Sequence, residues 1–341
     1  MAIEKMKEAI FYTRESDNHA RCELCRFRCL IADGSRGICG VRENRGGILR
    51  SLVYGLLCTA HIDPIEKKPL FHVMPGSKSY SIASVGCNFR CRHCQNHTIS
   101  QIHSSSRIPG EKRTPAMVVE NALNANCSSI SYTYTEPTVC FEFVCETAML
   151  AKQAGLLNIF VTNGYISSKA LETIAPYLDA SNIDLKAFSD GFYQNIAQAR
   201  LTEVLDSIIE YRKRGVWIEL TTLVIPGLND TEGEFRKIAD FIMGNLGSEI
   251  PWHISRFHPM HEMTDYPRTP LETLSLAVDI AKTSGLSYVY AGNAPSLSKE
   301  NTICPKCEEA LVERRGYLVV KNRIIEARCP DCGSSIPGIG M

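Results

Sequence analysis

An excess of charge of one sign and long apolar runs are both missing from this 341-residue chain. Lys plus Arg and Asp plus Glu each number 37, so the formal net charge is zero. This balance excludes a strong overall attraction to nucleic acid or to an anionic membrane, although it leaves room for a local basic patch. No apolar run approaches the roughly 18 residues of a membrane span, and the charged start of the chain lacks the pattern of a signal peptide. We therefore expect a cytoplasmic protein without a membrane partner.

Cysteine, in contrast, is abundant, with 15 residues. Disulfide frameworks are typical of small secreted domains, and this long chain without an export signal does not fit that class. Most of the cysteines fall into three compact groups, which indicates metal sites rather than disulfides. The remaining four lie in apolar surroundings and are interpreted as buried structural thiols: Cys58, Cys127, Cys140 and Cys145.

The central group is Cys87, Cys91 and Cys94, spaced CX3CX2C and placed directly after an apolar run at 80–85. That run predicts a buried strand. Four thiolates would close a metal site, but three thiolates leave one iron of a [4Fe–4S] cube without a protein ligand. An iron with a vacant position can bind a substrate, so the spacing itself predicts catalysis. The alternative is a zinc loop that uses a distant fourth cysteine.

The first group lies near the N-terminus and consists of four cysteines spaced CX2CX3CX9C: Cys22, Cys25, Cys29 and Cys39. Nearby glycines allow the turns with which a short loop wraps an ion. Four thiolates suit a closed tetrahedral zinc site, which is the preferred interpretation. A second iron–sulfur cluster is the alternative, because spacing alone does not distinguish the two metals.

The last group is a pair of CX2C knuckles, formed by Cys304, Cys307, Cys329 and Cys332. Paired knuckles with Pro and Gly turns predict a zinc ribbon. Two short strands at 311–313 and 317–320 are expected to form a hairpin between them. A segment this small buries little core, so metal binding is expected to stabilise it. Zinc ribbons also bind nucleic acid, which leaves RNA open as a ligand.

Between these groups, strand-like runs alternate with helix-like segments. Strands are predicted at 80–85, 129–134, 158–162, 181–185, 217–225, 252–257 and 288–291, and helices at 115–125, 139–154, 168–177, 202–214, 231–243 and 271–284. Such alternation predicts an α/β fold with a parallel sheet. Six or seven units are fewer than the eight of a closed barrel, so a partial (β/α)6-type TIM barrel is expected, although a doubly wound sheet has the same count.

We accordingly divide the chain into a four-cysteine metal-binding segment (1–60), a partial barrel (61–300) and a zinc-ribbon domain (301–341). Within the first segment, apolar residues at helical spacing predict a short amphipathic helix over 4–15. Active sites in such sheets collect where the strands end. Polar residues stand at those positions: Thr135, Glu136, Asn163, Asp184, Lys186 and His258.

Each of these residues also has a plain structural interpretation. Glu136 can bind an ammonium group, or the run Thr135-Glu136-Pro137 can be the N-cap of a helix. Asp184 and Lys186 share one face of a strand and can form an ion pair without any ligand. His258, directly before Pro259, suits the end of a strand as well as the mouth of a site.

The stretch 86–96, GCNFRCRHCQN, resembles the signature of radical S-adenosylmethionine (SAM) enzymes. From Cys22 through the ribbon, the chain resembles the radical SAM enzyme of the AmmeMemoRadiSam system, which is related to pyruvate formate-lyase activating enzymes. The resemblance implies a partial barrel, SAM and one [4Fe–4S] cluster held by Cys87, Cys91 and Cys94. It also implies reductive cleavage of SAM to a 5′-deoxyadenosyl radical, which abstracts hydrogen from an unidentified substrate.

The same resemblance implies the cofactor-binding positions and the partners. SAM would contact His93, Thr135, Glu136, Asn163, Asp184, Lys186 and His258. The partners would be the substrate, an electron donor such as ferredoxin or flavodoxin, and Memo-like and AMMECR-like proteins.

Two other functions fit parts of the sequence. Activation of a glycyl radical enzyme is suggested by the CX3CX2C spacing and by the run Asp184-Leu185-Lys186, which resembles a motif of the activases. Val161 stands where those enzymes carry an aspartate, and the two further cysteine groups also weaken this hypothesis. A non-catalytic multi-zinc RNA-binding or adaptor protein is the alternative of another class, and neutral charge counts against it.

Overall fold

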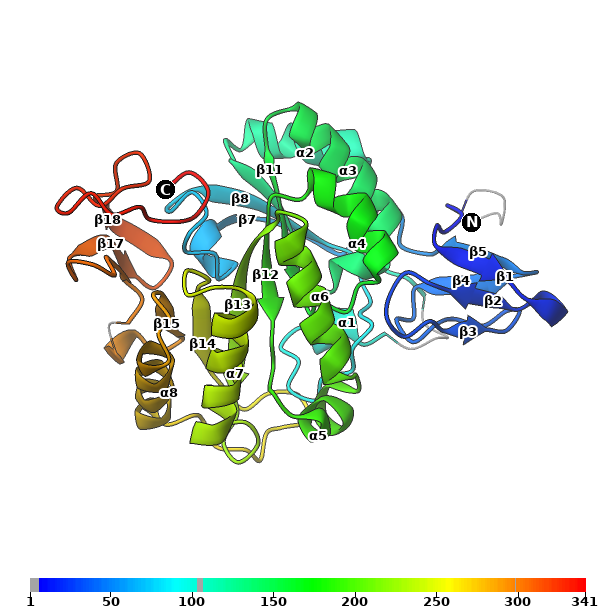
Figure 1. Cartoon of the computed structure of the whole chain (residues 1–341). Helices are drawn as coiled ribbons and strands as arrows, with labels where there is room; N and C mark the ends of the chain where they lie inside the picture. Colours follow the sequence, from blue (N-terminus) through cyan, green and yellow to red (C-terminus); the bar gives the residue numbers. More distant parts are fainter. Residues whose placement is uncertain (1–5, 103–106, 298) are drawn as a thin grey trace.

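An eight-stranded sheet forms the centre of the molecule (Figure 1). This computed structural model describes residues 6–102, 107–297 and 299–341. The strands follow the order β15-β14-β13-β12-β11-β10-β8-β7. Their bounds are β7 Thr59–Pro64, β8 Lys78–Ala83, β10 Ser129–Tyr132, β11 Leu157–Thr162, β12 Ala180–Asp184, β13 Trp217–Val224, β14 Trp252–Arg256 and β15 Val289–Gly292. From β8 to β15 the pairing is parallel, and β7 runs antiparallel at one edge.

Helices connect the parallel strands and cover the sheet. The main ones are α2 Pro115–Asn124, α3 Phe141–Gln153, α4 Ser168–Ile174, α6 Leu201–Lys213, α7 Glu232–Asn245 and α8 Leu271–Thr283, with short helices α1 His97–Ser100 and α5 Asp190–Phe192. Side-chain caps define several starts: Thr114, Ser167 and Thr231 each accept a backbone N–H of the first turn. Among the described residues, no helix is long and apolar enough to cross a bilayer.

The predicted strands and helices from residue 80 onward are confirmed, with ends shifted by a few residues. The helix predicted over 4–15 is wrong in its described part, and residues 4 and 5 lie outside the described residues. Glu8 bridges to Arg50, and β1 (Tyr12–Arg14) pairs with β2 (Ala20–Cys22). Pairing with distant backbone therefore overrides the local helical spacing.

The N-terminal segment lies on one side of the sheet, opposite the C-terminal hairpin (Figure 1). Its remaining strands are β3 Leu30–Ile31, β4 Arg42–Arg45, β5 Ile48–Ser51 and β6 Leu56–Leu57, the last paired with β9 Glu111–Lys112. A buried ion pair between Arg42 and Glu142 joins this segment to α3. Removing either partner would leave a buried charge uncompensated, so the contact holds the segment in place.

The C-terminal hairpin forms as predicted: β17 (Ala310–Arg315) and β18 (Leu318–Asn322) pair antiparallel, beside β16 (Thr302–Ile303). Buried Arg314 anchors it, because its Nη2 donates to the carbonyl of Phe71 at 2.9 Å and its Nε lies 3.6 Å from Glu66. The division of the chain at residues 60 and 300 stays a prediction.

Candidate active site

A large cavity opens where the parallel strands end, with an empty volume of about 1560 Å³. Nine of the predicted site residues line it: Cys87, Cys91, His93, Cys94, Thr135, Glu136, Asn163, Asp184 and Lys186. They come from the segments that follow β8, β10, β11 and β12. Neighbouring parallel strands end at the same edge of a sheet, which is why positions nearly 100 residues apart meet here.

The three-cysteine loop is fixed by its backbone. The N–H groups of Arg90 and Arg92 donate to the carbonyls of Ala197 and Ile196, at 3.1 and 3.0 Å. The side chain of Gln101 donates to the carbonyl of Cys91 at 2.9 Å. These contacts hold the loop against the segment after α5, so that the thiols face the cavity instead of the core.

The thiols meet the requirements of a cluster better than those of a zinc ion. No fourth cysteine occurs among the described residues that line this cavity. Among all described residues, only the C-terminal four cysteines form a group of potential metal ligands within 4.8 Å of one another. The sulfurs of Cys87, Cys91 and Cys94 therefore do not all lie within 4.8 Å of one another, whereas the sulfurs around one zinc ion lie about 3.8 Å apart. A site with three thiolates suits an iron–sulfur cube with one iron left open.

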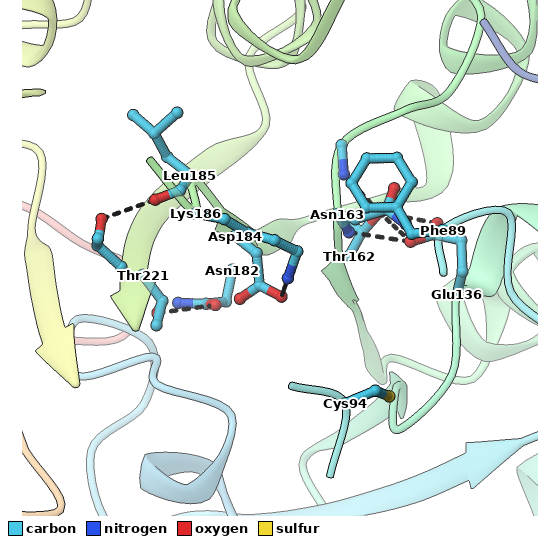
Figure 2. A network of polar contacts seen from close by, with 12 residues as sticks. Phe89, Cys94, Glu136, Thr162, Asn163, Asn182, Asp184, Leu185, Lys186 and Thr221 are labelled. Atoms are coloured by element: carbon cyan, nitrogen blue, oxygen red, sulfur yellow. Dashed lines mark hydrogen bonds and ion pairs between the residues drawn. The ribbon is translucent and has the colours of Figure 1, made fainter. Parts of the chain in front are cut away.

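Glu136 accepts hydrogen bonds from four donors at the edge of the cavity, and Figure 2 shows the contacts with Thr162 and Asn163. Its carboxylate accepts from the hydroxyls of Thr138 and Thr162 and from the backbone N–H groups of Thr138 and Asn163. Burial raises the pKa of Glu136, and these donors oppose that shift. The residue caps the 3₁₀ helix Pro137–Cys140, so its structural role is confirmed, while its contact with SAM stays a prediction.

Asp184 and Lys186 form an ion pair on the cavity wall, with 2.8 Å between Nζ and Oδ2 (Figure 2). Burial by itself lowers the pKa of Lys186, but the adjacent Asp184 carboxylate outweighs it and the net shift is upward. The ammonium is thus kept charged in a mostly buried place. Such a pair can bind a ligand that carries both a carboxylate and hydroxyl groups.

The imidazole of His93 and the amide of Asn88 are buried near the cysteines, and each has a nitrogen without a hydrogen-bond partner. His93 is 6% exposed and its Nδ1 has no partner. Burial lowers the pKa of His93 to about 3, so the ring is neutral. Asn163 donates to Oδ1 of Asn88 at 2.8 Å, whose own Nδ2 is unpartnered. Unpaired buried polar atoms are costly, and of these two groups His93 lines the cavity, which fits the binding of a polar cofactor there.

The structure adds residues that sequence reasoning did not select. Lys68 and Tyr134 line the cavity, and both contact Asp63, with 2.6 Å between Lys68 Nζ and Oδ2. Burial lowers the pKa of Lys68 to about 8, while Asp63 opposes the shift. Tyr317, from the ribbon hairpin, also lines the cavity. Lys68 lies in a connector rich in Pro and Gly, and Tyr317 begins a predicted strand of the ribbon, so the sequence marked neither as a site residue.

His258 is the one predicted cofactor residue that the structure places outside this cavity lining. Its Nε2 lies 3.3 Å from Nη2 of Arg268, on the exposed side of the segment after β14. Ser255 from the same strand lines the cavity instead. Ser255 lies in β14, whereas His258 follows the end of that strand at Arg256, which explains why the two side chains differ in direction.

The C-terminal cysteines form a compact metal-binding group. The ligand sulfurs of Cys304, Cys307, Cys329 and Cys332 all lie within 4.8 Å of one another. Two of the sulfur pairs are 3.6 Å apart. A zinc–thiolate bond of about 2.3 Å places tetrahedral sulfurs about 3.8 Å apart, so the spacing fits one tetrahedral metal ion.

The N-terminal cysteines also meet. Cys22, Cys25, Cys29 and Cys39 line a second, smaller cavity on the other side of the three-cysteine loop. Their burial agrees with a closed site.

Comparison with known proteins agrees with this site. A family model described as the radical SAM superfamily matches residues 81–242. Over 333 residues the chain is 45% identical to an uncharacterized protein of Methanocaldococcus jannaschii, covering 97% of this chain and 99% of that one. It is 20% identical over 195 residues to the pyruvate formate-lyase-activating enzyme of Clostridium pasteurianum, covering 55% of this chain and 82% of that protein.

A solved structure shares the fold. Streptococcus suis SuiB bound to S-adenosylmethionine aligns with a TM-score of 0.51 at 12% identity, over 67% of this chain and 53% of that one. The fold and the three thiols at the cavity define an α/β protein with a candidate cluster site at the end of a parallel sheet. Residues 81–242 form a radical SAM superfamily domain, and this family implies a [4Fe–4S] cluster and SAM. The predicted enzyme class is thereby confirmed.

Proposed function

We propose that this enzyme cleaves SAM reductively and abstracts a hydrogen atom from a substrate bound in the 1560 Å³ cavity. One observation carries the proposal: three thiols and no fourth cysteine, among the described residues, face a cavity lined by the polar ends of parallel strands. When bound, the cluster and SAM supply an electron and a 5′-deoxyadenosyl radical, which is chemistry that side chains alone do not perform.

The residues of the chain bind and orient these groups. Cys87, Cys91 and Cys94 would hold a [4Fe–4S] cluster, and with only three thiolates one iron would stay open to SAM. Glu136 accepts from the SAM ammonium, since a fixed carboxylate matches a cation. The Asp184–Lys186 pair holds the ribose hydroxyls and the carboxylate of the same ligand.

The remaining contacts are to adenine and to the substrate side. The backbone at His93 pairs with the adenine amino group, and the neutral imidazole lies beside it. Thr135 fixes the turn after β10, because its hydroxyl donates to the carbonyl of Ser84 at 2.7 Å. Tyr317 lies at the substrate side and helps to exclude water from the cavity.

At a finer level, we assign the chain to the AmmeMemoRadiSam system. The resemblance runs from Cys22 through the ribbon, and the Methanocaldococcus jannaschii relative matches over almost the full length. The partners in this assignment are an electron donor of the ferredoxin or flavodoxin class, and Memo-like and AMMECR-like proteins. In this proposal the ribbon binds zinc and contributes to the substrate side of the cavity.

Activation of a glycyl radical enzyme is the second candidate. Similarity to the Clostridium pasteurianum activating enzyme favours it. Val161, which lines the cavity where the activases carry an aspartate, and the ribbon residue Tyr317 at the same cavity count against it. An electron paramagnetic resonance signal of a glycyl radical on a candidate partner, formed only with this enzyme and SAM, would decide for activation.

The test of the main proposal is anaerobic. Wild type, a Cys87/Cys91/Cys94→Ala variant and a Cys145→Ala control are reconstituted, reduced with dithionite and supplied with SAM. We expect 5′-deoxyadenosine from wild type and from the control, because Cys145 lies on α3 outside the cavity lining. Equal product from the triple variant, or none from a cluster-replete wild type at any substrate tried, would overturn the proposal.

A further inference from the structure

The four N-terminal cysteines line one small cavity. Its walls are otherwise mostly apolar, with Leu24, Phe27 and Ile31 among the lining residues. The fold directs the thiols inward: the N–H of Cys22 donates to the carbonyl of Cys29 at 2.9 Å, which closes the loop between them. The fold therefore brings the four thiols to one site.

The spacing of these thiols differs from that of the ribbon. The ribbon sulfurs converge to within 4.8 Å of one another, and no such group forms elsewhere among the described residues. The four N-terminal cysteines are all described and line one cavity, yet no three of their sulfurs lie within 4.8 Å of one another. A single zinc ion needs sulfurs about 3.8 Å apart. Four irons and their sulfides at the centre require a wider arrangement.

A buried cation without a full set of partners faces the same cavity. Arg42 is 1% exposed and lines it. Its Nη1 donates to the carbonyl of Ile10 at 3.3 Å and its Nη2 pairs with Glu142, while its Nε has no hydrogen-bond partner. An unpaired buried donor is costly, and a cluster ligated by four thiolates is rich in sulfur acceptors. The unpartnered Nε of Arg42 thus fits a ligand with acceptor atoms in this cavity.

The second cavity adjoins the three-cysteine loop. Asn88, directly after Cys87, lines it. A Cβ added to Gly86 would lie 2.9 Å from the carbonyl oxygen of Cys39, so the two backbones are in close contact. Arg90 donates to the carbonyl of Cys87 at 2.8 Å and also to the carbonyl of Ile38. One layer of residues therefore separates the two thiol groups.

The site is also close to the surface. Ile38 lines the second cavity and is 45% exposed. A protein electron donor can therefore approach this side of the molecule, whereas the catalytic thiols face the cavity at the strand ends.

We propose that Cys22, Cys25, Cys29 and Cys39 hold a second [4Fe–4S] cluster, in place of the zinc ion expected from spacing, and that it passes electrons to the catalytic cluster. A ferredoxin- or flavodoxin-class donor gives one electron, which reduces the N-terminal cluster from the 2+ to the 1+ state. That electron then moves to the cluster at Cys87, Cys91 and Cys94, and the N-terminal cluster returns to 2+. The electron transfer rests on the proposed function, but the identity of the metal does not.

The first test is metal content in anaerobically prepared full-length protein. With four irons per cube, we expect about eight irons and one zinc in wild type, and about four irons and one zinc in the Cys87/Cys91/Cys94→Ala variant. The triple variant isolates the N-terminal site and cannot cleave SAM, so its iron content is independent of the catalytic proposal. Two zinc ions and no iron in that variant would overturn the inference. If the variant fails to fold, the wild type decides, because about four irons and two zinc ions there would overturn the inference equally.

The second test addresses electron transfer. In reduced wild type, we expect the two paramagnetic clusters to broaden each other's electron paramagnetic resonance signals. The triple and the quadruple cysteine variants each keep one cluster, so neither should show this broadening. A Cys22/Cys25/Cys29/Cys39→Ala variant should keep dithionite-driven 5′-deoxyadenosine formation but lose about tenfold with a flavodoxin donor. If the variant keeps the same fraction of the wild-type rate with flavodoxin as with dithionite, the relay is refuted and the cluster is a structural element.

Discussion

The hydroxyl of Thr162 lies 2.8 and 3.0 Å from the two carboxylate oxygens of Glu136 and joins the ends of β10 and β11 at the active-site cavity. Because Glu136 also caps the helix that follows it, one buried carboxylate fixes three neighbouring segments. The same group is the proposed acceptor for the SAM ammonium. Variants that differ in the charge at residue 136 can separate the structural role of Glu136 from its proposed role in SAM binding.

Glu136→Gln keeps the side-chain shape but places an NH2 group against donors. We expect the free energy of unfolding to fall by about 1–3 kcal/mol and 5′-deoxyadenosine formation to fall at least about tenfold. Thr138→Val is the matched control, because it removes one hydrogen bond to Glu136 and leaves the charge. Chemical denaturation and the product assay measure both effects. A Gln variant as active as the control would remove Glu136 from SAM binding.

Asp184→Asn removes the carboxylate that pairs with Lys186 on the cavity wall. Since Lys186 is mostly buried, we expect the lost partner to disturb the position of the ammonium and to raise the Kd for SAM about tenfold. Anaerobic calorimetry on reconstituted protein measures the affinity, and iron content should stay unchanged. Asp190→Asn is the control, since Asp190 is exposed at the start of α5. If Asp184→Asn binds SAM with the wild-type Kd, the Asp184–Lys186 ion pair has a structural role and does not contact SAM.

Tyr317 is the ribbon residue that reaches the cavity, and it is 50% exposed. We expect Tyr317→Ala to open the substrate side, so that air bleaches the catalytic cluster about threefold faster, by loss of a shielding aromatic side chain. The signal of the catalytic cluster is the difference in visible absorbance between protein with the three cysteines and the Cys87/Cys91/Cys94→Ala variant. Leu318→Ala is the control, because Leu318 is 66% exposed and not part of the cavity lining. Identical bleaching rates would contradict a shielding role.

His72 links the ribbon to the sheet and predicts a pH dependence. Its Nδ1 lies 2.7 Å from the carbonyl of Pro337 and its Nε2 lies 2.7 Å from the hydroxyl of Tyr290, so the neutral ring satisfies both contacts. Burial lowers the pKa of His72 from its usual value of 6.5 to about 4, against the attraction of Glu219. The unfolded chain therefore binds more protons than the folded one between these values, and stability rises with pH across this window.

Acidification from pH 6.5 toward 4 should accordingly cost up to about 3 kcal/mol through this one residue. The check is the difference in unfolding free energy between wild type and His72→Asn across this range, because acid effects on the metal sites are common to both. The variant should be less stable near neutrality, with a flatter pH profile. Parallel profiles would contradict the prediction.

Much of the fold could be predicted because its signals are local. Apolar runs of strand length alternate with amphipathic segments, and residues such as Thr114 and Thr231 mark the helix starts. The segment where the prediction failed, 6–15, has helical spacing but pairs with residues near Ser51. Local periodicity contains no information about such a distant partner, which is why the prediction was wrong there.

For the site, the sequence by itself determined the three cysteine groups and the polar residues at strand ends, since ligand spacing and strand length are properties of short segments. Only the tertiary structure brought Lys68 and Tyr317 to the cavity and placed His258 outside its lining. It also separated two four-cysteine groups that look alike in sequence, one converging on a point and one lining a cavity. The distance between thiols depends on how distant segments pack around them, and packing is decided by the whole chain.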